Sequence, residues 1–373
     1  MANCKELSFG KNLVFSLTGS SHGEYTGGIL CGIPKGVKID EEFLNMQLQR
    51  RRPGKYGTKR KEDDCPEFLS GITGGITNGE KLEFRIKNQD VRKQDYKDFE
   101  GWFRPSHADY PYYIKYKEDS LQHKDMASAR MYLPVTVAGT IARMWLLLQN
   151  VRIDAKAVRI GGIDTDGNED KINFLIEQTL KNGDTLGGRI RCSITGVRAG
   201  LGEPVFDKIS SSLAKAVMNI PSAVSFAMGD VLCREDLTGS TDIDNWTTGQ
   251  EGKTEDFKTS TNHCGGVNAG ITNGMPIVFY AGFHAVHTLG KAMTLISKDG
   301  ELKQQSINGR HDMCAVLRTP VIVESVAALV IADYMLVKTD QENEKYKINE
   351  YENNKNIVYC GYFVSVCGMQ QQY

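Results

Sequence analysis

Apolar residues recur at strand spacing in both the N-terminal and the C-terminal parts of the chain. Leu82, Phe84 and Ile86 alternate with polar residues, which is the period of a strand that buries one face. Residues 277–280 form a continuous apolar run, typical of a strand buried on both faces, and residues 13–17 are also strand-like. The pattern therefore predicts sheet segments in both parts.

Helical signals separate these strands. Asp125 is predicted to cap a helix that runs to Leu148, although Pro134 should kink or delay it. Residues 168–181 and 207–218 are amphipathic, and Thr319 before Pro320 predicts a capping hydroxyl at the start of a largely buried helix. The order lacks the regular alternation of a parallel sheet, so we expect mixed α and β structure with antiparallel hairpins.

A five-residue segment occurs twice. Gly-Ile-Thr-Asn-Gly at residues 75–79 recurs at residues 270–274, and each copy is followed by a strand-like stretch. Each copy ends in Asn-Gly, a strong hairpin signal. Two interpretations remain open: two unrelated turns of the same composition, or a pseudo-duplicated fold with two similar sheets.

Composition limits the class of protein. The chain has 373 residues, is 40% apolar, carries a formal net charge of −1, and contains no linker-like block, so we expect one domain over residues 1–373. A charge this small predicts no partner nucleic acid and no membrane surface. The apolar run at residues 321–337 is too short for a span. Nine scattered cysteines without a Cys-x-x-Cys pair, and no apolar N-terminal stretch, predict a soluble, cytoplasmic protein with reduced thiols.

Arginines cluster in segments without helical or strand period. Residues 50–54 read Arg-Arg-Arg-Pro-Gly, and Arg104, Arg130 and Arg310 stand beside polar, glycine or histidine residues. A solvated charged loop is the ordinary interpretation of such a run. Guanidinium groups also bind carboxylate and phosphate through paired hydrogen bonds, so converging arginines would suit a multiply charged anion. Spacing alone does not show that they converge.

Three histidines, His22, His107 and His311, lie in loops rich in Gly, Ser or Pro. Structural roles and proton transfer near neutral pH both remain open for them. His284 and His287 have a spacing compatible with metal binding, but no third ligand is evident, so no metal site is expected. The Gly-rich stretches at residues 71–79 and 265–274 match neither a dinucleotide fingerprint nor a Walker loop. The residues alone therefore point to an anion-binding enzyme that uses histidine.

Taken in order, a series of motifs resembles those of the chorismate synthase family and covers roughly residues 8–335. They are Gly19-Ser20-Ser21-His22-Gly23, Arg50-Arg51-Arg52-Pro53-Gly54, Leu69-Ser70-Gly71, Arg104-Pro105-Ser106-His107-Ala108-Asp109, Ser128-Ala129-Arg130, Leu201-Gly202-Glu203-Pro204-Val205-Phe206-Asp207, Thr272-Asn273-Gly274-Met275-Pro276-Ile277 and Gly309-Arg310-His311-Asp312. The resemblance implies an α+β fold, a pseudo-duplicated β-α-β sandwich whose two antiparallel sheets flank a helical layer, assembled as a homotetramer.

The resemblance also implies a reaction. The family is a group of lyases that convert 5-enolpyruvylshikimate 3-phosphate, a small anionic substrate, to chorismate by 1,4-elimination of phosphate, in aromatic amino acid biosynthesis. The reaction needs reduced FMN but has no net redox change. No nicotinamide fingerprint is present, so reduction by the chain itself with NADPH and reduction by an external flavin reductase both stay open. The alternatives are a paralogue that eliminates phosphate from a related cyclic acid, or an inactive anion-binding homologue.

Roles follow from the motif positions. By resemblance, His22 keeps the reduced flavin correctly protonated, His107 is the general acid toward the departing phosphate, and Asp312 helps to remove the ring hydrogen. The residues implied in substrate binding are Ser21, Arg51, Arg104, Arg130 and Arg310. Those implied in cofactor binding are Ser128, Ala269, His284, His287, Thr288 and Arg310.

The departures from the family pattern concentrate at flavin contacts. Met126 and Ala127 stand where the family has Arg and Ser, His284 replaces a Lys, and Ser20 replaces a Glu. At neutral pH a mostly uncharged histidine attracts a phosphate less than a permanent ammonium does. We therefore expect FMN to bind more weakly than in typical members, with an affinity that rises as the pH falls from about 8 to 6.

Overall fold

The computed structural model describes residues 7–54, 63–89, 101–117, 125–230, 232–248, 257–306 and 312–337. The chain divides into a compact unit, Met1–Met335, and a second unit, Leu336–Tyr373, of which only residues 336 and 337 are described. A single domain over the whole chain stays a prediction.

The N-terminal sheet has five antiparallel strands in the order β1-β2-β3-β7-β4. They are β1 (Ser8–Phe9), β2 (Val14–Gly19), β3 (Tyr25–Cys31), β7 (Leu82–Lys87) and β4 (Pro66–Ser70). Leu82, Phe84 and Ile86 on β7 are at most 1% exposed, while Arg85 and Lys87 point to solvent. The period-two pattern of the sequence is confirmed here, because one face of this sheet covers the core.

The C-terminal sheet has the order β10-β9-β11-β17-β12 and is also antiparallel. Its strands are β10 (Ile163–Asp164), β9 (Arg152–Ile160), β11 (Gly188–Thr195), β17 (Ile277–Phe283) and β12 (Ala223–Met228). β17 is buried at six of its seven positions, as its continuous apolar run predicted. The remaining described strands form small sheets: β5 (Ile72–Thr73) with β6 (Ile76–Thr77), β15 (Val267–Asn268) with β16 (Ile271–Thr272), β13 (Trp246–Thr247) with β14 (Lys258–Thr259), and β19 (Leu302–Ser306) with β18 (Ala292–Ser297) and β8 (Trp102–Phe103).

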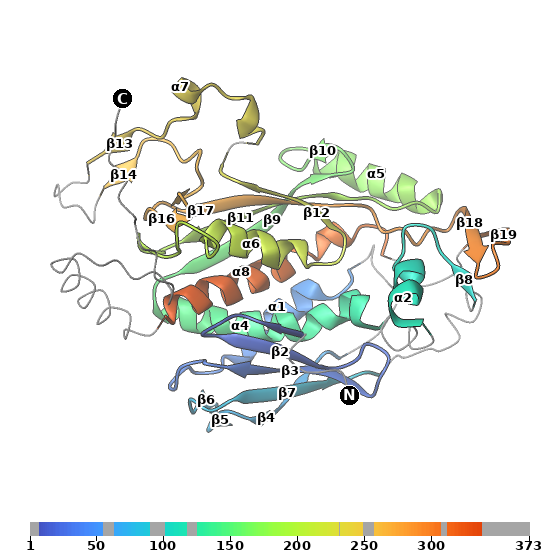
Figure 1. The fold of residues 1–373 in the computed structure, drawn as a ribbon, viewed down its shortest axis with the longest axis horizontal. Helices are drawn as coiled ribbons and strands as arrows, with labels where there is room; N and C mark the ends of the chain where they lie inside the picture. Colours follow the sequence, from blue (N-terminus) through green and yellow to red (C-terminus); the bar gives the residue numbers. More distant parts are fainter. Residues whose placement is uncertain are drawn as a thin grey trace, which may run out of the picture. The chain divides into compact units, whose positions relative to one another are not determined.

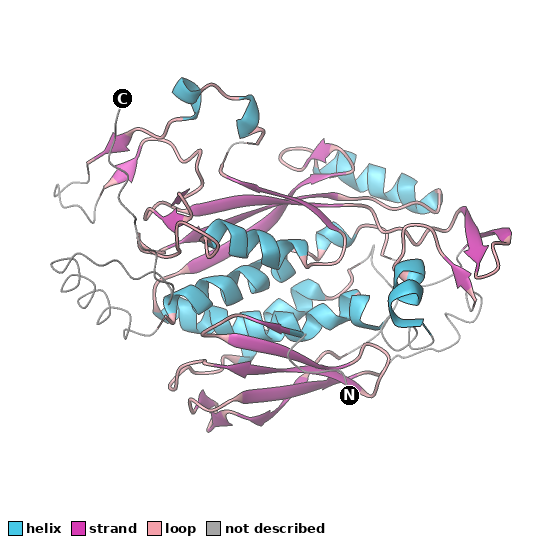
Figure 2. Ribbon diagram, viewed as in Figure 1, coloured by secondary structure: helices cyan, strands magenta, loops and turns pink. Residues whose placement is uncertain are grey.

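Four helices fill the space between the two large sheets (Figures 1 and 2). They are α1 (Glu41–Arg51), α4 (Tyr132–Leu148), α6 (Ile209–Met218) and α8 (Pro320–Met335). α4 packs on β2 and β3, α8 packs on β9 and β11, and α4 and α8 pack on each other. α2 (Asp109–Tyr116), α5 (Glu169–Lys181) and the short α7 (Gly239–Asp242) lie outside this layer. The α+β sandwich implied by the resemblance is confirmed.

The starts of α4 and α8 can be compared with the proline and capping signals that predicted them. Two 3-10 turns, η4 (Asp125–Ala127) and η5 (Ala129–Met131), precede α4, which begins two residues before Pro134, so the proline delays the helix as predicted. The predicted cap of α8 is wrong in its direction: the Thr319 hydroxyl donates backwards to the Ala315 carbonyl at 2.8 Å. Segment Ala129–Leu148 is long and apolar enough to cross a membrane by length and composition alone, but 78% of its apolar 18-residue window is buried in the fold, as in a core helix.

The repeated Gly-Ile-Thr-Asn-Gly segment reflects duplication. Thr77 Oγ1 donates to the Pro34 carbonyl at 2.6 Å and accepts a backbone N–H at 2.9 Å. Thr272 Oγ1 donates to the Arg198 carbonyl at 2.7 Å and accepts a backbone N–H at 2.9 Å. In each copy the segment ends a two-stranded hairpin and leads into the fourth strand of a five-stranded sheet. Two unrelated turns would not share this set, so the pseudo-duplicated interpretation holds.

Candidate active site

The two long central helices begin at the same end of the molecule. Arg130 lies in the 3-10 turn before α4, and Arg318 lies two residues before α8, after the 3-10 turn η8 (Ala315–Leu317). Arg51, in the last turn of α1, touches both places: its Nη2 donates to the Ala129 carbonyl at 3.1 Å, and its own carbonyl is 3.5 Å from Arg318 Nη1. The positive ends of two helix dipoles therefore meet near one another, which favours an anion.

These arginines surround two carboxylates. Arg130 Nη1 donates to Asp64 Oδ1 at 3.0 Å, and Arg51 Nη1 lies 3.7 Å from Asp64 Oδ2. Arg318 Nη2 donates to the Asp312 carboxylate. We call this set, Arg51, Arg130, Arg318, Asp64 and Asp312, the arginine cluster. The side chains of Arg51 and Arg130 are 4% and 7% exposed, so the interpretation of the basic run as a solvated loop is wrong for Arg51.

Positive charge exceeds negative charge in the arginine cluster. Three guanidinium groups face two carboxylates, and burial together with the charge of Arg318 lowers the pKa of Arg51 to about 9. The Nε atoms of Arg51 and Arg318 are buried and lack a hydrogen-bond partner among the described residues. Buried cations left incompletely paired are costly, so the cluster is suited to receive a further anion.

Arg50 has a different role from Arg51. Its guanidinium donates to both carboxylate oxygens of Glu324 on α8, at 2.6 and 2.8 Å, and Arg143 on α4 donates to the same carboxylate at 2.7 Å. Glu324 is 1% exposed. Of three consecutive arginines, Arg50 therefore fixes α1 in the helical layer, Arg51 enters the arginine cluster, and Arg52 is exposed.

The Ser21–His22 turn is joined to the arginine cluster by Asn88. Asn88 Nδ2 donates to the Ser20 and Gly23 carbonyls at 3.0 and 2.8 Å, while its Oδ1 accepts from Arg130 Nε at 2.6 Å. Ser21 is buried, and its Oγ lies 2.9 Å from His22 Nδ1. The structure thus brings Ser21, His22 and Arg130 together. The resemblance did not single out Asn88, although its place directly after a strand was a usable signal.

A second group, which we call the histidine cluster, contains His107, His284, His287 and Thr288. His107 Nδ1 is 3.0 Å from the Pro105 carbonyl, and its Nε2 is 2.9 Å from Thr288 Oγ1. The rings of His284 and His287 stack with centroids 4.1 Å apart, and His287 Nδ1 is 3.1 Å from the Ser106 carbonyl. Burial, followed by the charge of Arg104, lowers the pKa of His107. A carbonyl only accepts, so Nδ1 of His107 carries the proton and Nε2 accepts from Thr288.

Arg104 holds the loop that carries His107. Its Nε and Nη2 donate to the two carboxylate oxygens of Asp109 at 2.7 and 3.0 Å, and its backbone N–H donates to the same carboxylate at 3.1 Å. Asp109 is 2% exposed and begins α2. This bidentate pair places the positive charge of Arg104 near His107, which is the second cause of the lowered pKa.

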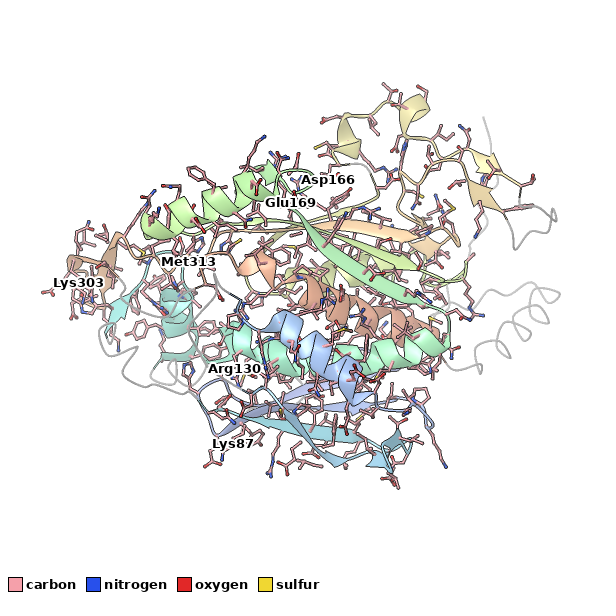
Figure 3. The ribbon with its side chains drawn as sticks, turned by 180° about the vertical axis from the view of Figure 1, so that it is seen from behind. Lys87, Arg130, Asp166, Glu169, Lys303 and Met313 are labelled. Carbon is pink, nitrogen blue, oxygen red and sulfur yellow. The ribbon has the colours of Figure 1, made fainter. Side chains whose placement is uncertain are left out.

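Consecutive residues of the C-terminal half connect the two clusters. Thr185 Oγ1 donates to the Val286 carbonyl at 2.6 Å, and the Leu186 N–H donates to the Met313 carbonyl at 2.8 Å. Val286 lies between the stacked histidines in sequence, and Met313 follows Asp312. Figure 3 shows Arg130 at the helical layer and Met313 above it, toward the C-terminal sheet. The arginine and histidine clusters are therefore neighbouring parts of one region.

Three predicted cofactor residues are not part of the histidine cluster: Ser128 and Ala269 lie in other segments, and Arg310 lies outside the described residues. Ser128 caps the η5 turn and accepts from the Arg130 N–H at 3.3 Å, so it adjoins the arginine cluster. Ala269 is exposed in the turn between β15 and β16, which precede β17, whereas His284 follows β17, so a strand of about 20 Å separates them. Arg310 lies outside the described residues, as does His311. Within the described ranges, no group of three or more His, Cys, Asp or Glu residues is placed to hold a metal.

This arrangement is that of an enzyme for a multiply charged anion on a duplicated α+β sandwich. A family model described as chorismate synthase matches residues 13–336. The chorismate synthase of Flavobacterium psychrophilum is 36% identical over 359 residues, covering 90% of this chain and 99% of that protein. That of Christiangramia forsetii is 38% identical over 353 residues, covering 88% and 97%. A crystal structure of chorismate synthase has the same fold, with a TM-score of 0.70, 23% identity, and coverage of 93% and 99%. The chain belongs to the chorismate synthase family.

Proposed function

We propose that the protein catalyses the 1,4-elimination of phosphate from 5-enolpyruvylshikimate 3-phosphate, forming chorismate with reduced FMN as cofactor. The observation that carries this proposal is the arginine cluster, in which three guanidinium groups face two carboxylates and two buried Nε atoms have no partner among the described residues. The substrate has two carboxylates and a phosphate, so it offers the negative charge that the cluster lacks. Ser21, Arg51 and Arg130 are the residues we assign to its binding.

The histidine cluster fits an anionic cofactor group. The Nδ1 atoms of His284 and His287 lie 2.5 and 3.1 Å from backbone carbonyls, and their Nε2 atoms have no hydrogen-bond partner among the described residues. Once a ring is protonated, its Nε2 becomes a donor for the phosphate group of FMN, and Thr288 lies next to His287 in the chain. When bound, reduced FMN would supply electron density that helps the substrate phosphate to leave. Fluorescence titration of FMN between pH 8 and 6 tests the predicted histidine dependence.

His107 is the proposed acid. Burial and the charge of Arg104 lower the pKa of His107, which favours the neutral ring in the free protein at neutral pH. An incoming phosphate dianion beside it has the opposite effect and raises that pKa, so His107 takes up a proton as the substrate binds. His107 then delivers the proton to an oxygen of the departing phosphate. Thr288, bonded to Nε2, orients the ring for this transfer.

His22 and Asp312 are assigned to the second part of the proposed reaction, which is the removal of the ring hydrogen. Ser21 fixes the His22 ring through Nδ1, so that Nε2 is the atom that holds or releases a proton. The Asp312 carboxylate is oriented by Arg318 and is the proposed final acceptor of the ring proton. A cytoplasmic location, a homotetramer and an external flavin reductase are proposed from family membership.

The test is an anaerobic incubation of the pure protein with reduced FMN and 5-enolpyruvylshikimate 3-phosphate, following chorismate and phosphate together. Equal amounts of both products are expected. Phosphate release from a different cyclic acid alone would indicate a paralogue with another substrate. Substrate binding without either product would indicate an inactive homologue. Replacing reduced FMN by oxidised FMN with NADPH shows whether the chain reduces its own flavin.

A further inference from the structure

Arg318 has no role assigned by the motifs, yet it lies inside the arginine cluster. Its side chain is 14% exposed, its Nη2 donates to Asp312, and its Nη1 is 3.5 Å from the Arg51 carbonyl. Its Nε is buried and has no partner among the described residues. In the sequence Arg318 lies between an apolar stretch and the helix start at Thr319 and Pro320. It has no neighbouring arginine or histidine, so the spacing of charged residues did not predict a functional role for it.

Duplication makes Arg318 the counterpart of the Arg130 region. α4 and α8 meet where a Cβ on Gly139 would lie 2.4 Å from Ser325 Cβ. The η5 turn begins ten residues before Gly139, and the η8 turn begins ten residues before Ser325. Each half of the fold therefore delivers one guanidinium from the joint between a 3-10 turn and its long central helix.

The Nε atoms that lack a partner among the described residues distinguish Arg51 and Arg318 from other arginines of the same protein that form ion pairs. Arg85, Arg104 and Arg234 each use Nε and Nη2 together against one carboxylate, with Nε distances of 2.9, 2.7 and 2.6 Å. In Arg318, Nη2 donates to the Asp312 carboxylate, but Nε has no partner among the described residues. The same is true of Nε in Arg51. Paired hydrogen bonds from Nε and Nη2 are the geometry in which arginine grips an oxyanion.

We propose that Arg318 is a binding residue for the substrate anion, acting beside Arg51 and Arg130, and that its Nη2 positions Asp312 at the same time. The proposal rests on the proposed function and names one further residue of that site. In the part of the chain that the structure describes, two carboxylates face the three guanidinium groups of this cluster, and a bound oxyanion adds the negative charge that partners the Nε atoms of Arg51 and Arg318.

Inorganic phosphate is the probe, because it tests anion binding without any turnover. We expect Arg318→Gln to raise the dissociation constant for phosphate, measured by calorimetry without flavin, about 10- to 100-fold. Arg318→Lys keeps the charge but loses the paired donors, so a smaller increase is expected. Arg234→Gln is the matched control: it removes the same charge from an equivalent ion pair with Asp242 and should bind phosphate as the wild type does. Circular dichroism and thermal unfolding establish that each variant is folded.

Wild-type phosphate affinity in folded Arg318→Gln, or no phosphate binding by the wild type, overturns the proposal. The outcome is separable from that of the proposed function. If phosphate binding depends on Arg318 but no chorismate forms, the anion site stands and the proposed reaction fails. If chorismate forms, Arg318→Gln should raise KM through lost binding and lower kcat through a displaced Asp312. Unchanged values of both would leave the reaction standing and remove Arg318 from it.

Discussion

The two halves of the duplicated fold share their strands but differ in the connections at the active-site end. In the N-terminal half, β2 and β3 are joined by residues 20–24, a tight turn that presents Ser21 and His22. In the C-terminal half, β9 and β11 are joined by residues 161–187, which include β10 and α5. The short connection contributes side chains, whereas the long one returns at Thr185 and Leu186 to bind backbone carbonyls near the histidine and arginine clusters.

The helices α1 and α6 also differ in whether they contribute charged side chains to the site. Both follow the second long strand of their sheet and lie in the central layer. α1 ends in Arg50 and Arg51, and α6 ends in Val217 and Met218, of which Val217 is fully buried. The equivalent helix ends of the two halves are therefore used differently. α1 places Arg51 in the arginine cluster, whereas α6 ends in apolar residues, and the charged residues that the C-terminal half contributes, Asp312 and Arg318, come from the segment before α8.

The largest effect is expected at His107, in the segment between β7 and α4 of the N-terminal half. His107→Ala should lower turnover about 10²- to 10⁴-fold, the usual contribution of a positioned general acid. The measurement is chorismate formation with saturating reduced FMN. Thr288→Val keeps the shape of its partner and should cause a smaller loss, because only the orientation of the ring is affected. Unchanged turnover in His107→Ala would remove this residue from the mechanism.

The buried carboxylate of Glu324 is expected to hold α1 in the helical layer through its ion pair with Arg50. Glu324→Ala leaves Arg50 and Arg143 without their carboxylate and should cost about 3–5 kcal/mol of unfolding free energy, measured by urea denaturation. Glu67→Ala removes an exposed pair with Arg85 and is the control, for which no measurable change is expected. Equal losses in the two variants would mean that the Glu324 pairs do not hold α1 in place.

The duplicated threonines test whether the halves are energetically equivalent. Thr77→Val and Thr272→Val each remove a side chain that bonds one buried carbonyl and one buried N–H. Each should cost about 1–3 kcal/mol, because the backbone partners lose their hydrogen bonds. Thr247→Val, at an exposed position, is the control, and denaturant unfolding is the measurement. Very different losses at Thr77 and Thr272 would show that the two halves have diverged in their framework as well.

The smallest effect concerns pH. The folded pKa of His107 lies below its unfolded value of about 6.5, so the unfolded state binds more protons as the pH falls below that value. The free energy of unfolding should therefore decrease as the pH falls from about 6.5 toward 5, and His107→Gln should reduce this decrease. Chemical denaturation at several pH values gives the comparison. An identical pH dependence in the variant would assign the effect to other groups.

Local periodicity predicted the scaffold well. The alternating burial of β7, the burial of six of the seven positions of β17 and the delayed start of α4 all depend on neighbouring residues, which the sequence displays directly. The arginine cluster could not be predicted from spacing, because Arg51, Arg130 and Arg318 come from three distant segments. Motif resemblance placed the first two, and the folded chain alone revealed the third. The same limit applies to Ala269, which strand geometry separates from the histidines that the motifs grouped with it.

The close approach of Gly139 to Ser325 has a consequence for motion. A methyl group at position 139 would lie 2.4 Å from the Cβ of Ser325, so the two central helices meet backbone against backbone. A hinge between the halves would separate this contact and expose the buried faces of α4 and α8 to water. The paired helices therefore act as a fixed base for the short segments 20–24 and 284–288, which carry the Ser21–His22 turn and the stacked histidines.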